Sequence, residues 1–481
     1  MKFKDLLWEI VPTRLIGSAE QEITGVCYDS RKVTPGSLFV AVKGFQNDGH
    51  AYIEKALAQG AAALLVQDMP EHLPETVACA QVPDTRKALA QVAAQWYGHP
   101  ERELKLIGLT GTNGKTTVTH LIRHMLEQSG EKCGLIGTNG VFFGAVARES
   151  ARTTPESLEL YGILREMADA GMTCVAMEVS SHSLVLDRVL GLPFAAAAFT
   201  NLTQDHLDFH GDMEQYYQAK KLLFDRCDTA VINCDDSWGA RLAGECGCQK
   251  ITLSARSVEA DLVAKSLRLQ PDGIQAVVVR DCDIARMSLA VPGMFSVYNG
   301  LTAVGCCLAL GMTLEQACAA LATAKGIKGR AEIVPTGRDF TVMIDYSHTP
   351  DSMENILRTV RGYAKGRIIG LFGAGGDRDK EKRPIMGRIA QEGCDLAIVT
   401  SDNPRSEEPE AIIRDILAGM GGKVRPKVIP DRREAIAWAV KNAQKDDIIV
   451  LMGKGQETYQ EILGVKHHLD EREEVAKALA L

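Results

Sequence analysis

A glycine-bounded loop between an apolar stretch and a helical stretch restricts the folds open to this chain more than any other feature. Residues 104–109 are apolar, a helix is predicted over residues 116–127, and the loop between them reads Gly111-Thr112-Asn113-Gly114-Lys115-Thr116-Thr117. A strand, a tight loop and a helix in this order point backbone N–H groups at phosphate oxygens, at the positive end of the helix dipole. Lys115 is expected to reach the β- and γ-phosphates of a nucleotide, and the Thr116 hydroxyl to bind Mg²⁺. Because Leu109 stands where the general phosphate-loop pattern has glycine, this loop is a shorter variant.

Apolar stretches alternate with helical ones along the whole chain, which is typical of an α/β protein with mostly parallel sheets. Strands are predicted at residues 37–42, 61–66, 104–109, 174–177, 195–200, 230–233, 342–344, 367–372, 396–400 and 448–451, and helices at 52–59, 86–97, 116–127 and 299–310. Breaks fall at residues 98–100 and 325–329, and a length of 481 residues suggests about three domains. We therefore predict domains at 1–100, 101–328 and 329–481. The central domain is expected to be a doubly wound sheet that carries the phosphate loop, and the C-terminal domain to be Rossmann-like.

Composition argues against several classes of protein. The chain has 62 acidic and 54 basic residues, so it lacks the positive excess of a general nucleic-acid binder. It has no apolar run of about 18 residues and no signal-peptide pattern, so neither a membrane span nor secretion is expected. The 13 cysteines are scattered, and Cys246-Gly-Cys248 and Cys306-Cys307 lack zinc-site spacing. Reduced thiols in a cytoplasmic protein are the expectation.

Two segments that follow predicted strands are rich in polar and metal-binding side chains. Glu178 follows the strand at 174–177, and a carboxylate at the carboxyl end of a parallel strand faces the ligand crevice. Residues 205–210 hold two aspartates and two histidines, which makes His206 a second candidate metal ligand; either side chain could instead be structural. Lys220 and Lys221 are predicted to begin a helix and to lie on its solvated face.

Five motifs together resemble the Mur ligase family, ATP-dependent cytoplasmic enzymes that build the peptide of peptidoglycan. They are GTNGKTT at 111–117, MEVSSH at 177–182, TNLTQDHLDFHG at 200–211, GRAE at 329–332 and DYSHTP at 345–350, in the family's order and spread over the chain. The resemblance implies a cytoplasmic ligase, most similar to the members that add meso-diaminopimelate to UDP-N-acetylmuramoyl-L-alanyl-D-glutamate through an acyl phosphate. It also implies a UDP-muramyl-binding first domain, an ATP-binding central domain and an amino-acid-binding C-terminal domain, acting as a monomer.

The resemblance assigns roles around the nucleotide. Lys220 matches the family's carbamylated lysine, whose anionic form helps to hold a second Mg²⁺ beside His206. The implied catalytic set is Lys115, Glu178, His206 and Lys220, and the implied metal-binding set is Thr116, Glu178, His206 and Lys220. Asn299, Arg330, Asp345 and His348 match residues that enclose the nucleotide together with Gly111, Thr112, Asn113, Gly114, Lys115, Thr116 and Thr117.

The resemblance also assigns substrate contacts. Tyr28, Ser30, Phe45, Gln46 and Asn47 match the uridine-nucleotide site, and Thr153, Thr154, Ser180 and Arg188 match the muramyl-dipeptide site. Arg31 and Lys43 could pair with the diphosphate or could be solvated. Leu186 stands where some relatives have a glutamine, so that contact is expected to be absent.

The segment Asp402-Asn403-Pro404-Arg405 resembles the form of this loop that selects diaminopimelate. Diaminopimelate carries a distal carboxylate that lysine lacks, and a guanidinium fork such as that of Arg405 can bind it with two charge-assisted bonds. Gly453 and Glu457 can accept hydrogen bonds from the distal ammonium, and Arg378 matches a further carboxylate contact.

Three alternatives remain open from the sequence. The first is a lysine-adding ligase of the same family, and the second is a related ligase such as a folate polyglutamate synthetase. The third is a phosphate-loop ATPase that makes no bond. The first domain and the 402–405 loop argue against the second, and the 200–211 and 402–405 loops argue against the third.

Overall fold

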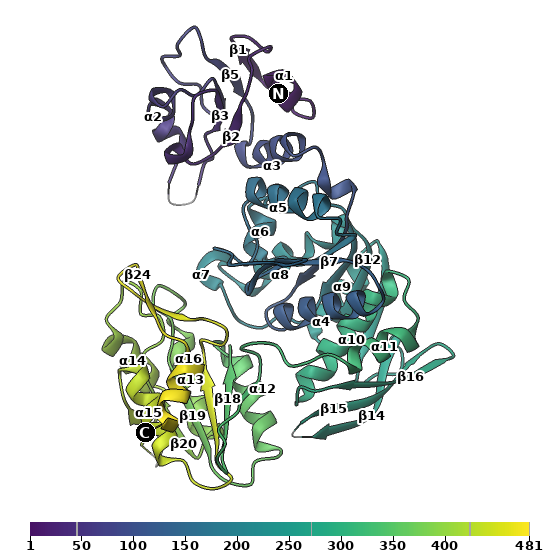
Figure 1. The fold of residues 1–481 in the computed structure, drawn as a ribbon, viewed down its shortest axis with the longest axis vertical. Coiled ribbons are helices and arrows are strands. Elements are labelled where there is room, and N and C mark those ends of the chain that lie inside the picture. Colours follow the sequence, from purple (N-terminus) through teal and green to yellow (C-terminus); the bar gives the residue numbers. More distant parts are fainter. Residues whose placement is uncertain (45–46, 271, 423–424, 481) are drawn as a thin grey trace.

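The computed structural model describes residues 1–44, 47–270, 272–422 and 425–480. Three large sheets follow one another along the chain, and Figure 1 shows the part that carries the N-terminus at one end of the long axis. The predicted α/β architecture with a phosphate loop in the central sheet is confirmed. Among the helices of the described ranges, none is both long and apolar enough to span a bilayer.

The first sheet has five strands in the order β1-β5-β4-β3-β2, parallel except for the β1–β5 pair. Its strands run over Arg14–Ile16 (β1), Gly25–Cys27 (β2), Ser37–Val40 (β3), Ala63–Val66 (β4) and Ala78–Gln81 (β5). The helices are α1 (Phe3–Leu6), α2 (Ile53–Ala58) and α3 (Thr85–Trp96). Helix α3 packs against α5 of the central part, so the first sheet is joined to the central one through two helices.

The central sheet has eleven strands in the order β16-β15-β14-β13-β12-β11-β6-β10-β7-β8-β9. Strands β6 (Lys105–Thr110), β7 (Cys133–Gly137), β10 (Cys174–Glu178), β11 (Phe194–Phe199), β12 (Cys227–Asn233) and β13 (Gln249–Ser254) form its parallel middle. Both ends are antiparallel, which the sequence did not predict. One end carries β8 (Gly140–Phe143) and β9 (Val146–Arg148), and the other β14 (Leu262–Gln270), β15 (Gly273–Arg280) and β16 (Asp283–Leu289).

Helices cover both faces of the central sheet. Helices α4 (Lys115–Gln128), α10 (Met294–Ala309) and α11 (Leu314–Ala322) share one apolar core, in which Leu121 and Leu301 are buried. Helices α5 (Ser157–Asp169), α8 (Met213–Lys221) and α9 (Ser237–Glu245) contribute to the core on the other face, and the short α6 (Ser181–Val185) and α7 (Leu207–His210) lie near α8. The sheet is therefore doubly wound.

Two element predictions in the central domain are wrong. Lys220 and Lys221 end helix α8 instead of beginning a helix, because Asp212 caps its N-terminus by accepting from the backbone N–H of Gln215. The helix predicted from residue 299 begins at Met294, so Asn299 lies inside α10 and not at its start.

The C-terminal sheet has six strands in the order β17-β18-β22-β19-β20-β21, parallel except for the β17–β18 pair. They run over Glu332–Val334 (β17), Thr341–Asp345 (β18), Ile368–Phe372 (β19), Leu396–Val399 (β20), Lys427–Val428 (β21) and Ile448–Met452 (β22). The helices are α12 (Pro350–Arg361), α13 (Lys382–Gly393), α14 (Pro409–Leu417), α15 (Arg432–Asn442) and α16 (Glu471–Ala480), and a hairpin joins β23 (Tyr459–Ile462) to β24 (Val465–His468).

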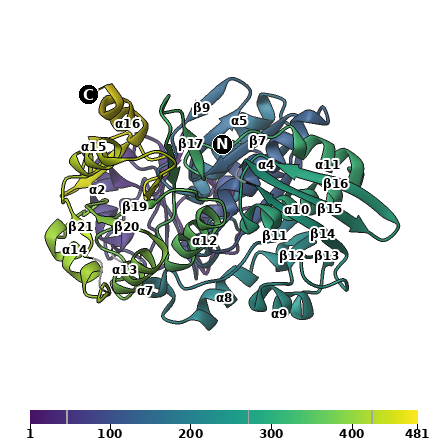
Figure 2. The ribbon, with the colours of Figure 1, turned by 90° about the horizontal axis from the view of Figure 1, so that it is seen from below.

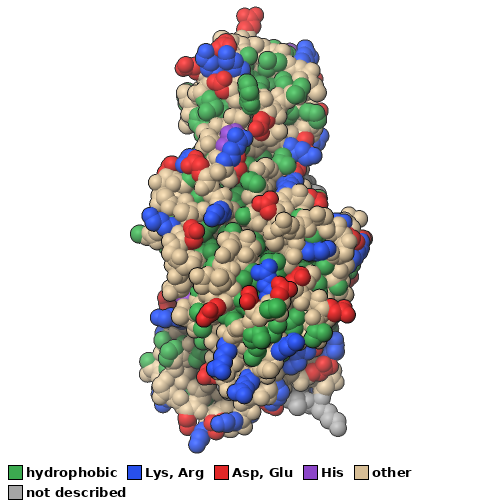
Figure 3. Space-filling model, turned by 90° about the vertical axis from the view of Figure 1, so that its right-hand side faces the viewer, with side chains coloured by type: hydrophobic (Ala, Val, Ile, Leu, Met, Phe, Trp, Pro, Cys, Tyr) green, Lys and Arg blue, Asp and Glu red, His purple; other side chains and the backbone are tan. Residues whose placement is uncertain are grey.

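Helix α12 faces the central domain, as Figures 1 and 2 both show. The loops that follow β6, β10 and β11 therefore meet the loops that follow β18, β20 and β22. Ligands of open parallel sheets bind at these carboxyl ends. Away from this junction, acidic and basic side chains are interspersed on the face drawn in Figure 3.

Candidate active site

The phosphate loop begins and ends on glycines that no other residue can replace without strain. Gly111 has φ +141°, and a Cβ there would lie 1.9 Å from the Thr200 hydroxyl oxygen. Gly114 has φ +90°, and a Cβ would lie 2.6 Å from Oδ1 of Asn299. The backbone N–H of Asn113 donates to Oδ1 of Asn201 at 2.9 Å, which holds the loop against the segment after β11. The predicted strand–loop–helix unit is therefore present, with α4 beginning at Lys115.

Two lysine ammonium groups converge on one peptide oxygen of this loop. Lys115 Nζ lies 2.8 Å and Lys220 Nζ 2.9 Å from the carbonyl oxygen of Gly111. Burial lowers the pKa of both side chains, and their mutual repulsion adds to the effect at Lys220. The expectation that Lys220 is solvated is wrong, since only 1% of it is exposed and its ammonium lies 4.4 Å from the centre of the Tyr216 ring. The burial of Tyr216 and Tyr217 sets the phase of α8 and turns Lys220 inward.

Glu178 stands at the end of β10 and binds the start of α4. Its Oε1 accepts from the Thr116 hydroxyl at 2.9 Å and from the backbone N–H of Thr138 at 2.8 Å. Arg330 donates to the same Thr116 hydroxyl oxygen at 2.9 Å, which brings a cation of the C-terminal part to the phosphate loop. Thr138 also lies 3.0 Å from Thr153, one of the predicted substrate contacts.

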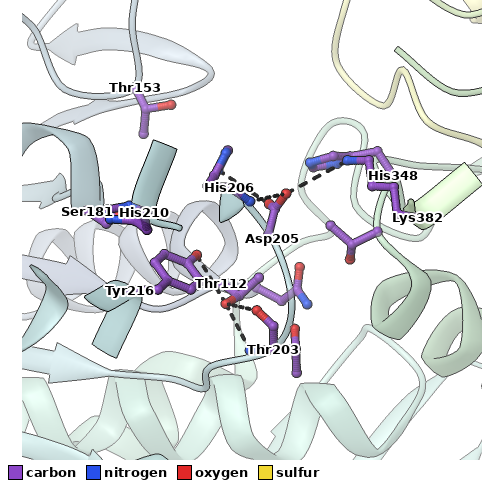
Figure 4. Close-up of polar contacts among 12 residues, drawn as sticks. Thr112, Thr153, Ser181, Thr203, Asp205, His206, His210, Tyr216, His348 and Lys382 are labelled. Atoms are coloured by element: carbon purple, nitrogen blue, oxygen red, sulfur yellow. Dashed lines mark hydrogen bonds and ion pairs between the residues drawn. The ribbon is translucent and has the colours of Figure 1, made fainter. Parts of the chain in front are cut away.

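Asp205 links the two large domains, as Figure 4 shows. Its carboxylate lies 3.3 Å from Nε2 of His206 and 3.8 Å from Nζ of Lys382, at the start of α13. Burial would raise the pKa of Asp205, but the neighbouring His206 and Lys382 lower it below its ordinary value. Burial lowers the pKa of His206, which favours the neutral imidazole, the form that can act as a ligand.

The donor set fits Mg²⁺ that is bound jointly with phosphate. Across the described residues, no three His, Cys, Asp or Glu side chains are grouped as a metal cage. Magnesium binds through one or two carboxylates, phosphate oxygens and water, and does not need such a cage. The Glu178 carboxylate and the Thr116 hydroxyl provide oxygen atoms of this kind beside the phosphate loop.

One cavity of about 660 Å³ brings most of the predicted residues together. It lies between the central and C-terminal domains, and we call it the interdomain cavity. The predicted residues that line it are Thr112, Asn113, Gly114, Lys115, Thr116, Thr117, Thr153, Glu178, His206, Asn299, Arg330, Asp345, His348, Arg378, Asp402, Asn403, Arg405, Gly453 and Glu457. Gly111, Lys220 and Pro404 do not line it.

The C-terminal wall nearest the nucleotide loop is rigidly held. Asp345 accepts from the Ser347 hydroxyl and from the backbone N–H of Ala331, the latter at 2.7 Å, and burial raises its pKa. His348 Nδ1 lies 2.7 Å from the carbonyl oxygen of Tyr346. The Arg330 guanidinium lies 4.5 Å from the centre of the Tyr346 ring.

A buried polar network forms the other end of the interdomain cavity. Nδ2 of Asn403 donates to Glu457 at 2.9 Å, and Lys454 donates to Oδ1 of Asn403 at 2.9 Å and to Glu457 at 3.0 Å. Burial raises the pKa of Glu457, while Lys454 acts in the opposite direction. Asp402 lies against Gly453, where an added Cβ would come within 2.5 Å of Oδ2 of Asp402. Sequence reasoning missed Lys454, although it lies inside the glycine-rich turn that drew attention to Glu457.

Arg405 is held at the mouth of this network. Its φ is +52°, it donates to the carbonyl oxygen of Gly376 at 2.6 Å, and its Nε lies 3.5 Å from Glu461. Pro404 packs its carbonyl oxygen against Gly376, where a Cβ would come within 1.9 Å. Arg378 is exposed, borders the cavity and donates to the carbonyl oxygen of Asp377 at 2.9 Å.

Two further interdomain residues were not predicted. Asp351, at the start of α12, accepts from Nδ2 of Asn113 at 2.8 Å. Lys382, which pairs with Asp205, is only 6% exposed. Asp351 directly follows the motif at 345–350, but nothing in the sequence marks Asp351 or Lys382 as an interdomain contact, which depends on the placement of α12 and α13.

A second cavity of about 1430 Å³ lies where the first domain meets the central one. Tyr28, Ser30, Asn47, Arg188 and Leu186 line it. Tyr28 donates to Glu159 at 2.8 Å. Phe45 and Gln46 lie outside the described residues.

The second cavity continues toward the interdomain cavity through one segment. Arg152 and Pro155 line the second cavity and Thr153 lines the interdomain cavity. Next to them, Thr154 donates to the carbonyl oxygen of Glu178 at 2.9 Å and accepts from the backbone N–H of Ser180 at 3.1 Å. Arg31 and Lys43 are paired with Asp29 and Asp68.

Known proteins match the chain along its length. It matches the descriptions "Mur ligase family, catalytic domain" over residues 22–97, "Mur ligase middle domain" over 109–307 and "Mur ligase, glutamate ligase domain" over 329–455. It is 45% identical over 480 residues to the UDP-N-acetylmuramoyl-L-alanyl-D-glutamate–2,6-diaminopimelate ligase 1 of Clostridium acetobutylicum, with 99% of each chain covered.

Solved structures match it as well. A UDP-N-acetylmuramoyl-L-alanyl-D-glutamate–2,6-diaminopimelate ligase has 30% identity and a TM-score of 0.70, and the match covers 100% of this chain and 99% of the other. The MurF ligase of Thermotoga maritima in complex with ADP has the same fold, with a TM-score of 0.63 at 19% identity over 91% of this chain and 94% of the other. The chain therefore belongs to the Mur ligase family.

Proposed function

We propose that this chain joins meso-diaminopimelate to UDP-N-acetylmuramoyl-L-alanyl-D-glutamate at the expense of ATP, in the synthesis of peptidoglycan precursors in the cytoplasm. The observation that carries the proposal is the interdomain cavity, which has the phosphate loop at one end and Asn403, Arg405 and Glu457 at the other. Relatives named for this reaction match the chain over 99% of its length at 45% identity.

The central domain provides the chemistry of phosphoryl transfer. An anionic carboxylate must attack the γ-phosphate of ATP, so negative charge has to be neutralised on both partners. Lys115 lies in the phosphate loop and Arg330 reaches it from the C-terminal side, which supports a role for both cations at the phosphates. The product is an acyl phosphate, whose phosphate is a better leaving group than the oxygen of a free carboxylate.

Glu178, Thr116, His206 and Lys220 are the residues that would hold Mg²⁺. Bound Mg²⁺ supplies positive charge at the phosphates and at the attacking carboxylate. Lys220 serves as a carbamate, because burial and Lys115 favour its neutral amine, and a neutral amine is the form that combines with carbon dioxide. The carbamate replaces a cation next to Lys115 by an anion and so removes the repulsion between the two side chains.

The C-terminal domain, residues 329–481, receives the amino acid. The Arg405 guanidinium binds the distal carboxylate of diaminopimelate, with Asn403 beside it, and Glu457 and the Gly453 carbonyl accept from the ammonium. Asn403 and Glu457 are held in one buried network, since neither side chain can turn away without breaking hydrogen bonds to Lys454. Their fixed positions support the assignment of separate contacts to the distal carboxylate and the ammonium. Arg378 is assigned to a substrate carboxylate at the rim of the same cavity.

The first domain, residues 1–100, holds the uridine nucleotide at Tyr28, Ser30 and Asn47, and Phe45 and Gln46 are assigned with them. The dipeptide runs past Thr153, Thr154, Ser180 and Arg188 to the phosphate loop in the central domain, residues 101–328. The adjacent placement of Arg152 and Thr153 in the two cavities supports this path. Leu186 gives the second cavity an apolar side chain where some relatives have a polar one.

Product formation is the direct test. Purified protein is incubated with UDP-muramyl-dipeptide, ATP, Mg²⁺ and either meso-diaminopimelate or L-lysine, and the UDP-muramyl-tripeptide is measured by mass spectrometry. Tripeptide with diaminopimelate and far less with lysine is the expected result. Equal use of lysine would contradict the assigned selectivity, and ADP release without both acceptors would indicate an ATPase instead of a ligase.

A further inference from the structure

Three cysteine thiols meet at one end of the central sheet, away from every residue assigned to the ligase reaction. Cys227 begins β12, Cys246 follows α9, and Cys248 comes just before β13. The Sγ atom of Cys248 lies 3.6 Å from that of Cys227 and 3.5 Å from that of Cys246. The sequence shows only the Cys246-Gly-Cys248 pair, and the fold adds Cys227 to it.

The position of these thiols makes a bond between Cys227 and Cys248 feasible. Strands β12 and β13 are parallel neighbours with Thr229 opposite Gln249, so the chain segments at the beginnings of the two strands lie side by side. A disulfide needs a sulfur–sulfur distance of about 2.05 Å, and the present distance closes by small movements of two side chains. The pair Cys246–Cys248 is separated by a single residue, so its ring would be much smaller.

Accessibility distinguishes this cluster from the pair Cys133 and Cys174. Cys227, Cys246 and Cys248 are all partly exposed, so a small reagent can reach them. Cys133 and Cys174 are opposite each other on β7 and β10, but each is only 1% exposed. Cys282 is exposed and, within the part of the chain that the structure describes, contacts no other thiol.

Cys227 and Cys248 have the geometry of a dithiol, with their sulfur atoms 3.6 Å apart. We propose that Cys227 and Cys248 are a redox modification site, which a small-molecule disulfide such as oxidised glutathione converts to an intramolecular disulfide. Cys246 is a neighbouring thiol that this bond does not require.

The reaction is a pair of thiol–disulfide exchanges. The Cys248 thiolate attacks one sulfur of oxidised glutathione, and one glutathione leaves. The Cys227 thiolate then attacks the Cys248 sulfur, and the second glutathione leaves. Two electrons pass from the cysteines to glutathione, and the two protons of the cysteine thiols end on the two glutathione molecules. Burial and the adjacent Cys248 raise the pKa of Cys227, so its thiol ionises less readily than a free cysteine.

The bond would close a loop that contains α9. Glu245, the last residue of α9, accepts from Lys221 at 2.7 Å and from Tyr217 at 2.9 Å, and so binds this loop to α8. The site is therefore anchored to the helix that carries Lys220, although none of its thiols contacts the interdomain cavity.

Peptide mapping of the full chain tests the proposal. The protein is incubated with oxidised glutathione, free thiols are alkylated after denaturation, and the digest is analysed by mass spectrometry. We expect a linked pair of peptides that contain Cys227 and Cys248, with two hydrogens lost, and its disappearance on reduction with dithiothreitol. Cys133 and Cys174 should remain alkylatable.

Three variants assign the bond. Cys246→Ser and Cys282→Ser should keep the linked peptides, whereas Cys248→Ser should lose them while keeping wild-type ligase activity, which shows that it folds. If wild-type Cys227 and Cys248 stay reduced, carry only glutathione, or if Cys248 links to Cys246 instead, the proposal is wrong.

Discussion

The charges at the base of the interdomain cavity lie on side chains that water barely reaches. Lys220 and Asp205 are almost completely buried, and each has an ionisable neighbour in another element. A buried charge is costly unless it is paired, so burial and nearby charges shift the pKa values of these two side chains. Because such side chains are sensitive to small chemical changes, substitutions at these positions test the proposed active site most directly.

Lys220→Ala should reduce tripeptide synthesis by about a hundredfold or more, the size of effect seen when a preorganised electrostatic group is removed. ATP binding should be partly kept, because Lys115 still lies in the phosphate loop. Lys221→Ala is the matched control, since its neighbouring ammonium is partly exposed and pairs with Glu245. Turnover and ATP affinity are measured for both; near-normal turnover of Lys220→Ala would refute the carbamate role.

His120 makes folding stability depend on pH. Burial lowers its pKa from 6.5 to about 4, and its Nε2 has no hydrogen-bond partner among the described residues. Below pH 6.5 the unfolded chain takes up a proton that the folded chain does not, so stability falls as the pH drops toward 4. This loss should be smaller in His120→Phe by about 3 kcal/mol at most. Denaturant unfolding at pH 7.5 and pH 4.5 measures the difference; identical losses in both proteins would contradict it.

The roles of some candidate site residues can be predicted from the sequence, and the roles of others cannot. Lys115 could be derived from loop chemistry alone, because a lysine after two spaced glycines has few other uses. Lys220 could not, since two adjacent lysines do not show which of them faces the core; only the resemblance singled it out. Lys454 was missed for the same reason, because the sequence does not reveal that its ammonium is buried between Asn403 and Glu457.

At the scale of elements, the parallel strands were predictable and the antiparallel ends of the central sheet were not. Strands β6, β10 and β11 are short, mostly apolar and followed by polar loops, which is the pattern of a buried parallel sheet. Strands β14 and β15 mix apolar residues with polar or charged ones in no clear period, so their sequences do not distinguish a strand from a helix. The sequence therefore allowed the loops that follow the parallel strands to be placed at one edge of the sheet. It did not allow the number or the direction of the outer strands to be predicted.

Gly114→Ala should disrupt the phosphate loop. The substituted residue would keep a left-handed conformation and place its Cβ 2.6 Å from Asn299, and strain of this kind costs roughly 1–3 kcal/mol. ATP affinity should fall by about tenfold. Gly130→Ala is the control, because Gly130 has φ +94° just beyond the end of the same helix but meets nothing within 4 Å. Isothermal titration with ATP should distinguish them, and equal affinities would contradict the loop's role.

The loop after β20 should select the amino acid. Arg405→Ala is expected to raise the KM for diaminopimelate about a hundredfold and to leave the KM for ATP nearly unchanged, since a lost bidentate pair costs several kcal/mol. Arg388→Ala, an exposed arginine paired with Glu392 on α13, is the control. Steady-state kinetics with each substrate varied provides the test, and equal effects on both KM values would exclude a role in recognition.

For the whole molecule, the interdomain cavity exists only while the central and C-terminal domains are in contact. Three polar contacts join them near the phosphate loop, Asn113–Asp351, Thr116–Arg330 and Asp205–Lys382. Two of these contacts use residues assigned to ATP, and Asp205 is next to His206, so the proposed nucleotide site overlaps the domain contact. Closure of the domains would both assemble the site and exclude water.

Asp351→Ala should weaken this contact by about 1 kcal/mol, the usual net worth of one hydrogen bond, or about a fivefold shift toward an open arrangement. Small-angle X-ray scattering should then give a larger radius of gyration than for wild type. Glu354→Ala, an exposed residue one turn along α12, should leave it unchanged. If both variants scatter like wild type, Asp351 does not hold the domains together.

The carbonyl oxygen of Gly111 accepts hydrogen bonds from the ammonium groups of both Lys115 and Lys220. Loss of the charge on Lys220 would weaken its hydrogen bond to this oxygen and leave the oxygen more available to Lys115. Gain or loss of carbon dioxide at Lys220 would therefore change the hydrogen bonding of Lys115, the residue assigned to the nucleotide phosphates. The backbone oxygen of Gly111 would in this way couple the chemical state of Lys220 to the hydrogen bonding of Lys115.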